Sequence, residues 1–78
     1  MTPSERFKTT LSDFEELMML KYSDTLDSLS ATKYKRHDGK MLTLFFYLDT
    51  YCGAWLGGEA WEYDAKEYLA NKEVEADA

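Results

Sequence analysis

The aliphatic side chains of this 78-residue chain are nearly all unbranched at Cβ, with ten Leu, seven Ala and four Met against one Val and no Ile. β-Branched aliphatic residues favour strands, whereas Leu, Met and Ala favour helices. This aliphatic composition therefore predicts an all-α fold, which we expect to be a small bundle of three or four helices. The two Trp, six Tyr and four Phe act in the other direction, because aromatic residues also suit a sheet.

The first thirty residues carry apolar side chains at helical spacing. Thr2-Pro3-Ser4-Glu5 has the pattern of a helix start, with Thr2 as the N-cap. A second cap pattern begins at Ser12. The apolar stripe comprises Phe7, Leu11, Phe14, Met18, Tyr22, Leu26 and Leu29. We expect either one helix to about residue 30 or two helices joined at Ser23-Asp24.

Residues 30–40 are polar and basic and form a connection. Asp38-Gly39 has the composition of a type I′ hairpin turn, which would place Lys33 and Lys35 opposite two leucines. The competing interpretation makes Asp38 the N-cap of a helix from Gly39 to Leu56. Its apolar stripe would comprise Met41, Leu44, Phe45, Leu48, Cys52 and Trp55. The spacing favours the helix, and an α+β fold with a hairpin around Asp38-Gly39 is the alternative.

The C-terminal third is predicted to form the last helix. Gly57-Gly58 should end the preceding helix, and the next is expected from Glu59 to about Lys72. Its inner face would be formed by Trp61, Ala65, Tyr68 and Leu69. We expect residues 1–72 to form a single helical domain, since so short a chain has no room for a second core. Residues 73–78 are expected to form an acidic, frayed tail.

Residues that could carry chemistry are few. Cys52 lies within the apolar stripe, where a thiol usually packs as a small apolar side chain. Asp49 is expected to reach solvent at the edge of the core or to pair with a lysine. His37-Asp38 supplies too few ligands for a metal site, and no phosphate-binding glycine loop is present. We therefore predict a non-enzymatic protein without a cofactor or a metal.

The compartment is indicated by what the chain lacks. A single cysteine excludes an internal disulfide and indicates a reducing environment. The N-terminus has no signal-peptide core, and no segment approaches the roughly 18 consecutive apolar residues of a membrane span. We predict a cytoplasmic protein with no membrane contact.

The net charge is unevenly distributed along the chain. Residues 1–48 hold seven acidic and seven basic residues, whereas residues 49–78 hold eight acidic residues against Lys66 and Lys72. The second segment therefore accounts for the whole net charge of −6. Such asymmetry bears on partners and solubility, not on the fold.

A helix over Met41–Leu56 would be apolar nearly all round, which two other helices of a small monomer can hardly cover. It is either a central core helix with ordinary exposed aromatic residues, or a helix whose aromatic residues meet a second copy or another protein. We therefore predict an adaptor or inhibitor, of the kind found among phage and plasmid regulators, that docks on a larger protein. Charge complementarity favours a basic partner, such as a nucleic-acid-processing protein, and a homodimer is expected. The predicted contact residues are Phe46, Tyr47, Tyr51, Glu59, Glu62, Tyr63 and Glu67.

The alternative function is a small nucleic-acid-binding regulator. Its predicted contact residues are the basic ones of the connection, Lys33, Lys35, Arg36 and Lys40. An isoelectric point near 4.6 opposes approach to phosphates. Nucleic acid is therefore the less favoured partner.

Overall fold

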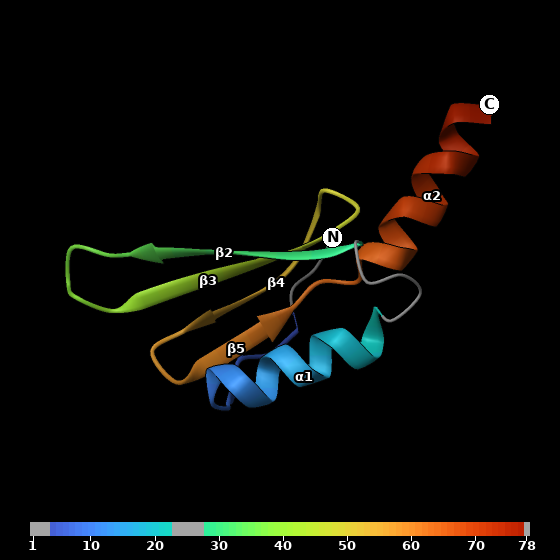
Figure 1. Cartoon of the computed structure of the whole chain (residues 1–78). Coiled ribbons are helices and arrows are strands. Elements are labelled where there is room, and N and C mark those ends of the chain that lie inside the picture. Colours follow the sequence, from blue (N-terminus) through green and yellow to red (C-terminus); the bar gives the residue numbers. More distant parts are fainter. Residues whose placement is uncertain (1–3, 23–27, 78) are drawn as a thin grey trace.

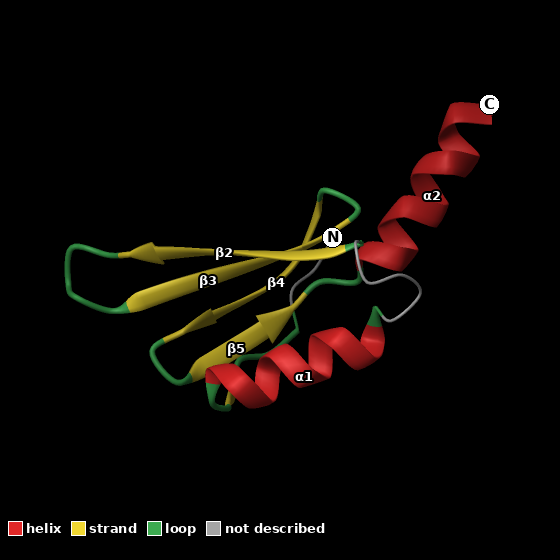
Figure 2. Ribbon diagram, in the orientation of Figure 1, coloured by secondary structure: helices red, strands yellow, loops and turns green. Residues whose placement is uncertain are grey.

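The computed structural model describes residues 4–22 and 28–77. Within them the chain forms an antiparallel sheet of five strands with two helices, so the predicted all-α helical bundle is wrong. The elements in chain order are β1 (Phe7–Lys8), α1 (Leu11–Lys21), β2 (Leu29–Lys35), β3 (Met41–Tyr47), β4 (Thr50–Leu56), β5 (Glu59–Glu62) and α2 (Ala65–Asp77). The strand order is β1-β5-β4-β3-β2, so β2 to β5 form a meander and β1 pairs at its end (Figures 1 and 2).

The predicted helix from Gly39 to Leu56 is instead the pair of strands β3 and β4. The sequence Leu42-Thr-Leu-Phe-Phe-Tyr47 is almost entirely apolar, and a segment that is apolar on all sides matches a helical period as well as a period of two. Aromatic residues supply the strand propensity that Val and Ile supply elsewhere. The absence of Ile was therefore a misleading indicator of helix.

Two tight turns connect the later strands. Leu48 and Asp49 have φ of 50° and 62° and join β3 to β4, with Tyr47 paired to Thr50. Positive φ at both central positions is the type I′ geometry, here without the usual Asn or Gly. Gly57-Gly58, predicted to end a helix, is the corresponding turn between β4 and β5, with φ of 55° and 95°.

The hairpin of β2 and β3 has a three-residue loop, His37-Asp38-Gly39. The Gly39 N–H donates to the Arg36 carbonyl at 3.0 Å, and the Arg36 N–H donates to the Lys40 carbonyl at 2.9 Å. Gly39 has a φ of 83°, as the third position of such a loop requires.

This longer loop shifts the pairing by one residue from the register of a two-residue turn. Lys33 pairs with Thr43 and Lys35 with Met41, while Tyr34 faces Leu42. A shift of one residue moves every side chain to the other face of the sheet. The mismatch between lysine and leucine that favoured a helix therefore does not arise, and the alternative with a hairpin at Asp38-Gly39 agrees with the structure.

Helix α1 starts later than the first cap pattern predicts. Its N-cap is Thr10, whose Oγ1 accepts the Asp13 N–H at 3.2 Å. Residues that precede it are extended, and Phe7 pairs with Ala60 in the sheet. Thr2-Pro3, the Ser23-Asp24 joint and Leu26 lie outside the described residues, and Leu29 begins β2.

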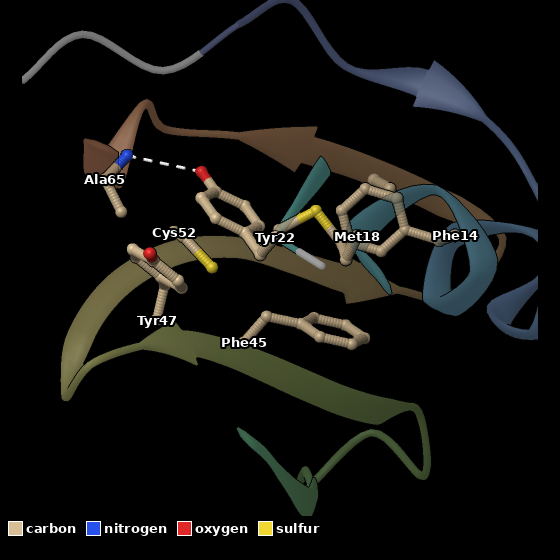
Figure 3. Close-up of a cluster of buried hydrophobic side chains, with 8 residues drawn as sticks. Phe14, Met18, Tyr22, Phe45, Tyr47, Cys52 and Ala65 are labelled. Atoms are coloured by element: carbon tan, nitrogen blue, oxygen red, sulfur yellow. Dashed lines mark hydrogen bonds between the residues drawn. The ribbon is translucent and has the colours of Figure 1, made fainter. Parts of the chain in front are cut away.

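The core lies between α1 and one face of the sheet. The buried stripe of Phe14, Met18 and Tyr22, predicted from helical spacing, is confirmed. Figure 3 shows these side chains facing β3 and β4, where the rings of Phe14 and Phe45 meet edge to face at 5.1 Å. The ring centroids of Tyr22 and Tyr47 lie 4.6 Å apart.

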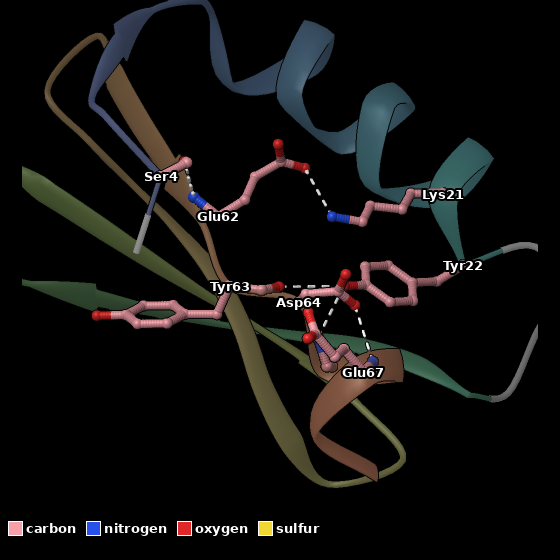
Figure 4. Close-up of polar contacts among 8 residues, drawn as sticks. Ser4, Lys21, Tyr22, Glu62, Tyr63, Asp64 and Glu67 are labelled. Atoms are coloured by element: carbon pink, nitrogen blue, oxygen red, sulfur yellow. Dashed lines mark hydrogen bonds and ion pairs between the residues drawn. The ribbon is translucent and has the colours of Figure 1, made fainter. Parts of the chain in front are cut away.

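Helix α2 begins at Ala65 and not at Glu59, because Glu59–Glu62 pairs with β4 as a strand. The Tyr22 hydroxyl accepts the Ala65 N–H at 3.3 Å and donates to the Tyr63 carbonyl at 3.2 Å (Figure 4). This side chain joins the end of α1 to the start of α2. Beyond its first turn α2 extends away from the sheet (Figure 1). Neither described helix is long and apolar enough to cross a lipid bilayer.

Candidate functional site

The two faces of the sheet differ in what covers them. Phe45 and Ala60 point toward α1, and α2 packs Ala65 and Leu69 into the same cluster. Side chains alternate along a strand, so their neighbours point to the opposite face, which no described element covers. We term this the open face, formed by the partly buried Leu42, Leu44, Phe46, Tyr51, Leu56, Trp61 and Tyr63 around Ala54, which is fully buried.

A β-bulge places Tyr51 on the open face. Phe45 pairs with Gly53, but Phe46 pairs with Tyr51, so that Cys52 is the extra residue of the bulge. Without it, Cys52 would lie opposite Phe46 on the open face and Tyr51 would point into the core. The bulge therefore keeps the Cys52 thiol in the core and places the Tyr51 ring, instead of the thiol, on the open face.

Tyr51 is the centre of an aromatic cluster. Its ring centroid lies 4.7 Å from that of Tyr63 and 6.1 Å from that of Phe46. The Trp61 indole N–H donates to the Tyr51 hydroxyl at 3.1 Å. Partial burial among these rings raises the pKa of Tyr51. The cluster is thus ordered by ring contacts and one hydrogen bond while its members remain half-buried at the surface.

The β1 and β5 edge of the open face carries charges of both signs. The Arg6 guanidinium lies over the Trp61 ring, 4.5 Å from its centroid. Lys8 pairs in register with Glu59, and Glu59 shares the face of Trp61. The charges that β1 and β5 bring to this border therefore sum to about +1, although the whole chain carries −6.

The structure divides the predicted contact residues into two groups. Phe46, Tyr51 and Tyr63 form the aromatic cluster, with Glu59 at its border. The remaining three lie elsewhere. Tyr47 is buried against α1, Glu62 points toward α1 with a carboxylate oxygen 3.8 Å from the Lys21 amine, and Glu67 is exposed in the first turn of α2. Figure 4 shows the Tyr63 ring pointing away from Tyr22 and the Glu62 carboxylate extending to Lys21.

Four large members of the open face were absent from the predicted set: Leu42, Leu44, Leu56 and Trp61. The signal that could have identified Leu42, Leu44 and Trp61 is the alternation of β3 and β5. With a period of two, Leu42, Leu44 and Phe46 share one face, and Trp61 shares a face with Glu59 and Tyr63. A helical period instead separates Leu44 from Leu42 and Phe46, and Trp61 from Glu59 and Tyr63.

The predicted basic residues form a second exposed feature, the basic arm, which is the hairpin end from Lys33 to Lys40. All of its residues are exposed, and Tyr34 retains half of its accessible surface. Arg36 lies 3.6 Å from Asp38 within the loop. Figure 1 shows this hairpin extending from the sheet at the end opposite α2. The structure therefore brings the four basic candidates together at one tip.

The residues considered for catalysis, Cys52, His37 and Asp49, lie in three different parts of the structure. Cys52 is fully buried, and burial raises the pKa of its thiol to about 12. His37 lies in the exposed loop of the basic arm, and Asp49 in the turn between β3 and β4. Among residues 4–22 and 28–77, no group of three or more His, Cys, Asp or Glu is placed to hold a metal ion.

No protein-family model, curated protein or solved structure matches this chain significantly.

Proposed function

We propose that this chain is a non-enzymatic interaction protein, an adaptor or inhibitor, that binds another polypeptide through its open face. The observation that carries the proposal is the continuous apolar and aromatic surface formed by β3, β4 and β5 on the side away from both helices. Sheets with one face in water normally alternate apolar and polar residues. Here Leu42, Leu44 and Phe46 stand where polar residues would be expected.

The chemistry of the cluster also suits protein recognition. Interface centres are enriched in Tyr, Trp and Phe, and poor in charged residues. Tyr51, Trp61 and Tyr63 combine flat apolar rings with polar ends, and their contacts with one another hold them in place. An ordered surface loses less side-chain entropy when it binds. Because Cys52 keeps its proton in the core, the proposal assigns it no nucleophilic role.

The test is site-specific photo-crosslinking in the native host. Thr32 is exposed and lies opposite Leu44 at the border of the open face. Thr32→p-benzoyl-phenylalanine should give a discrete crosslinked protein band. The same photoreactive residue at Leu20, 79 % exposed on the outer side of α1, should not give that band.

A matched pair of charge substitutions gives the control. Leu44→Glu, combined with the crosslinker at position 32, places a charge in the open face and should abolish the band. Leu20→Glu makes the same chemical change on α1 and should leave it intact. A chain that gives no band from position 32, or the same band from both positions, contradicts the proposal.

A second candidate function rests on the basic arm. It is a two-stranded ribbon with Lys33, Lys35, Arg36 and Lys40, and a two-stranded ribbon fits the major groove of duplex DNA. The molecule is 45 Å long, and α2 lies at the other end. Since the Debye length is about 8 Å at physiological salt, the acidic residues of α2 act only weakly at the arm.

Fluorescence anisotropy with a labelled duplex oligonucleotide tests this second function. Four phosphate contacts predict that log K falls with log[salt] with a slope of about −3.6. The variant Lys33→Ala/Lys35→Ala/Arg36→Ala should reduce the slope to about −0.9, which leaves one contact. No binding at 50 mM salt, or a slope unchanged in the variant, would exclude the arm as a nucleic-acid site.

A further inference from the structure

We infer that the polypeptide bound by the open face is a second copy of this chain, with the two sheets packed face to face around a two-fold axis. This inference rests on the proposed function of the open face and names its partner. In such a dimer Leu44, Phe46 and Tyr51 of each copy form a second core, and the helices lie on the two outer sides. The arrangement has four layers, helix, sheet, sheet and helix.

Charge distribution favours a second copy over a basic partner. The β1 and β5 edge of the open face carries charges of both signs, Arg6, Lys8 and Glu59, so a two-fold axis can set a basic group of one copy against the acidic group of the other. A basic partner would meet no acidic ring around the apolar centre. The register also places Lys8 beside Glu59, so a two-fold axis can bring Lys8 of one copy near Glu59 of the other.

Other surfaces of the molecule are poorly suited to self-association. The edge strand β2 carries Lys33 and Lys35, and pairing two such edges would bring like charges together. The outer side of α1 exposes Leu17 and Leu20, but Asp13 and Glu16 lie on the same stripe at helical spacing. Two copies joined through this side of α1 would bring their acidic side chains together, and these would repel one another.

The size of the open face sets the strength of the dimer. The open face covers the seven residues of β3, the seven of β4 and the four of β5, which at about 3.3 Å per residue and about 4.8 Å between strands gives about 290 Å² of flat area on each copy. Side-chain relief adds to this value, and the pair belongs to the small interfaces that bury less than about 1,200 Å². We therefore expect a weak dimer that dissociates in the high micromolar range. Packed sheets lie about 10 Å apart, a spacing that interdigitating Leu and aromatic side chains fill.

Sedimentation velocity of the purified full chain, from micromolar to millimolar concentration, tests the inference. The weight-average mass should rise from 9.1 kDa toward twice that value. Leu44→Glu should hold the mass at the monomer value over the whole range, while Leu20→Glu should dimerise as the wild type does. An unfolded Leu44→Glu would be recognised by its circular dichroism.

A measurement on the wild type makes the result independent of any variant. Amide chemical shifts recorded during dilution should change at Leu44, Ala54 and Trp61 and stay constant along α1. A wild type that stays at 9.1 kDa up to millimolar concentration overturns the inference, as does a mass rise that Leu20→Glu abolishes and Leu44→Glu does not.

The two proposals fail in different ways. A monomeric wild type that still gives a band from position 32 in the native host retains the proposed function and loses the second copy as the partner. A monomeric wild type that gives no band loses both.

Discussion

Gly53 allows α1 to approach the centre of the sheet, and Gly53→Ala tests how tightly the two are packed. A Cβ at this position would lie 3.0 Å from Met18 Cε, 3.0 Å from the Trp61 carbonyl oxygen and 3.2 Å from Phe14 Cζ. Two of these atoms belong to flexible or ring side chains in a full core, and the third is backbone. At least one neighbour has to move.

The expected magnitude is a difference of two opposing effects. Overpacking a filled core costs about 1–3 kcal/mol, whereas replacing Gly by Ala within a strand returns about 0.5–1 kcal/mol of backbone entropy. The difference of these ranges is roughly 0–2.5 kcal/mol, and because one close contact is to a backbone atom we expect a net loss of about 1–2.5 kcal/mol, against a total stability of about 4–12 kcal/mol for a chain of this length. For a domain of this size that loss lowers Tm by about 4–20 °C.

Thermal unfolding followed by circular dichroism measures the shift, and urea unfolding at 25 °C measures the free energy of unfolding. Met18→Leu removes the Cε atom and should recover part of the loss in a double-mutant cycle. Recovery should be incomplete because the Trp61 carbonyl cannot move aside. A Gly53→Ala protein that unfolds at or above the wild-type Tm would refute the assigned packing of α1 on β4.

The remaining predictions concern Tyr22, Cys52 and Trp55. Tyr22→Phe leaves the Ala65 N–H without its acceptor and should lower the free energy of unfolding by about 1–3 kcal/mol in urea titrations. Burial raises the pKa of Tyr22 from 10.0 to about 12, so the folded state favours the neutral phenol; the advantage of wild type over Tyr22→Phe should be full below pH 10 and decline between pH 10 and 12. The Cys52 thiol should resist iodoacetamide at pH 8 in the folded protein and react in 8 M urea, whereas Thr32→Cys should add one thiol that reacts at once. Trp55→Phe removes the indole N–H that donates to the Thr9 carbonyl at 2.8 Å and should cost about 0.5–1.5 kcal/mol, measured by the same urea assay with Trp61→Phe for comparison.

Local signals in the sequence were sufficient for some of the fold. The stripe of Phe14, Met18 and Tyr22 is the inner face of α1, and both Asp38-Gly39 and Gly57-Gly58 interrupt regular structure where their composition indicates. The start of α1 was not identified: the sequence offered cap patterns at Thr2 and Ser12, whereas the N-cap of α1 is Thr10. Phe46, Tyr51 and Tyr63 were predicted as contact residues, and they lie together at the surface.

The sheet itself could not be inferred from these signals. Residues 41–56 are apolar on both faces, so a helical period fits them as well as a period of two, and the turn at Leu48-Asp49 carries none of the usual Gly or Asn markers. The hairpin register depended on whether the loop has two residues or three, which is decided by the hydrogen bonds of Arg36 and not by composition. A two-residue loop would shift the register of β2 by one residue and set Lys33 and Lys35 opposite leucines, which is why the sequence alone favours a helix over the hairpin.

The apolar residues on both faces of β3 and β4 also bear on how the chain is stabilised. A 78-residue chain buries only about 60 % of the surface that its unfolded state exposes, and a second apolar face left in water makes that balance worse. Helix α1 has eleven residues, or about 16 Å of length, enough to cover one face of the central strands but not both. Helix α2 could have covered the other face, yet Tyr22 and Ala65 direct its start to the α1 side and the rest of it leaves the sheet. Apolar residues on both faces of β3 and β4 are therefore accounted for if the open face is covered by another polypeptide, and a second copy would bring to it an equally apolar face with charges of both signs at its β1 and β5 edge.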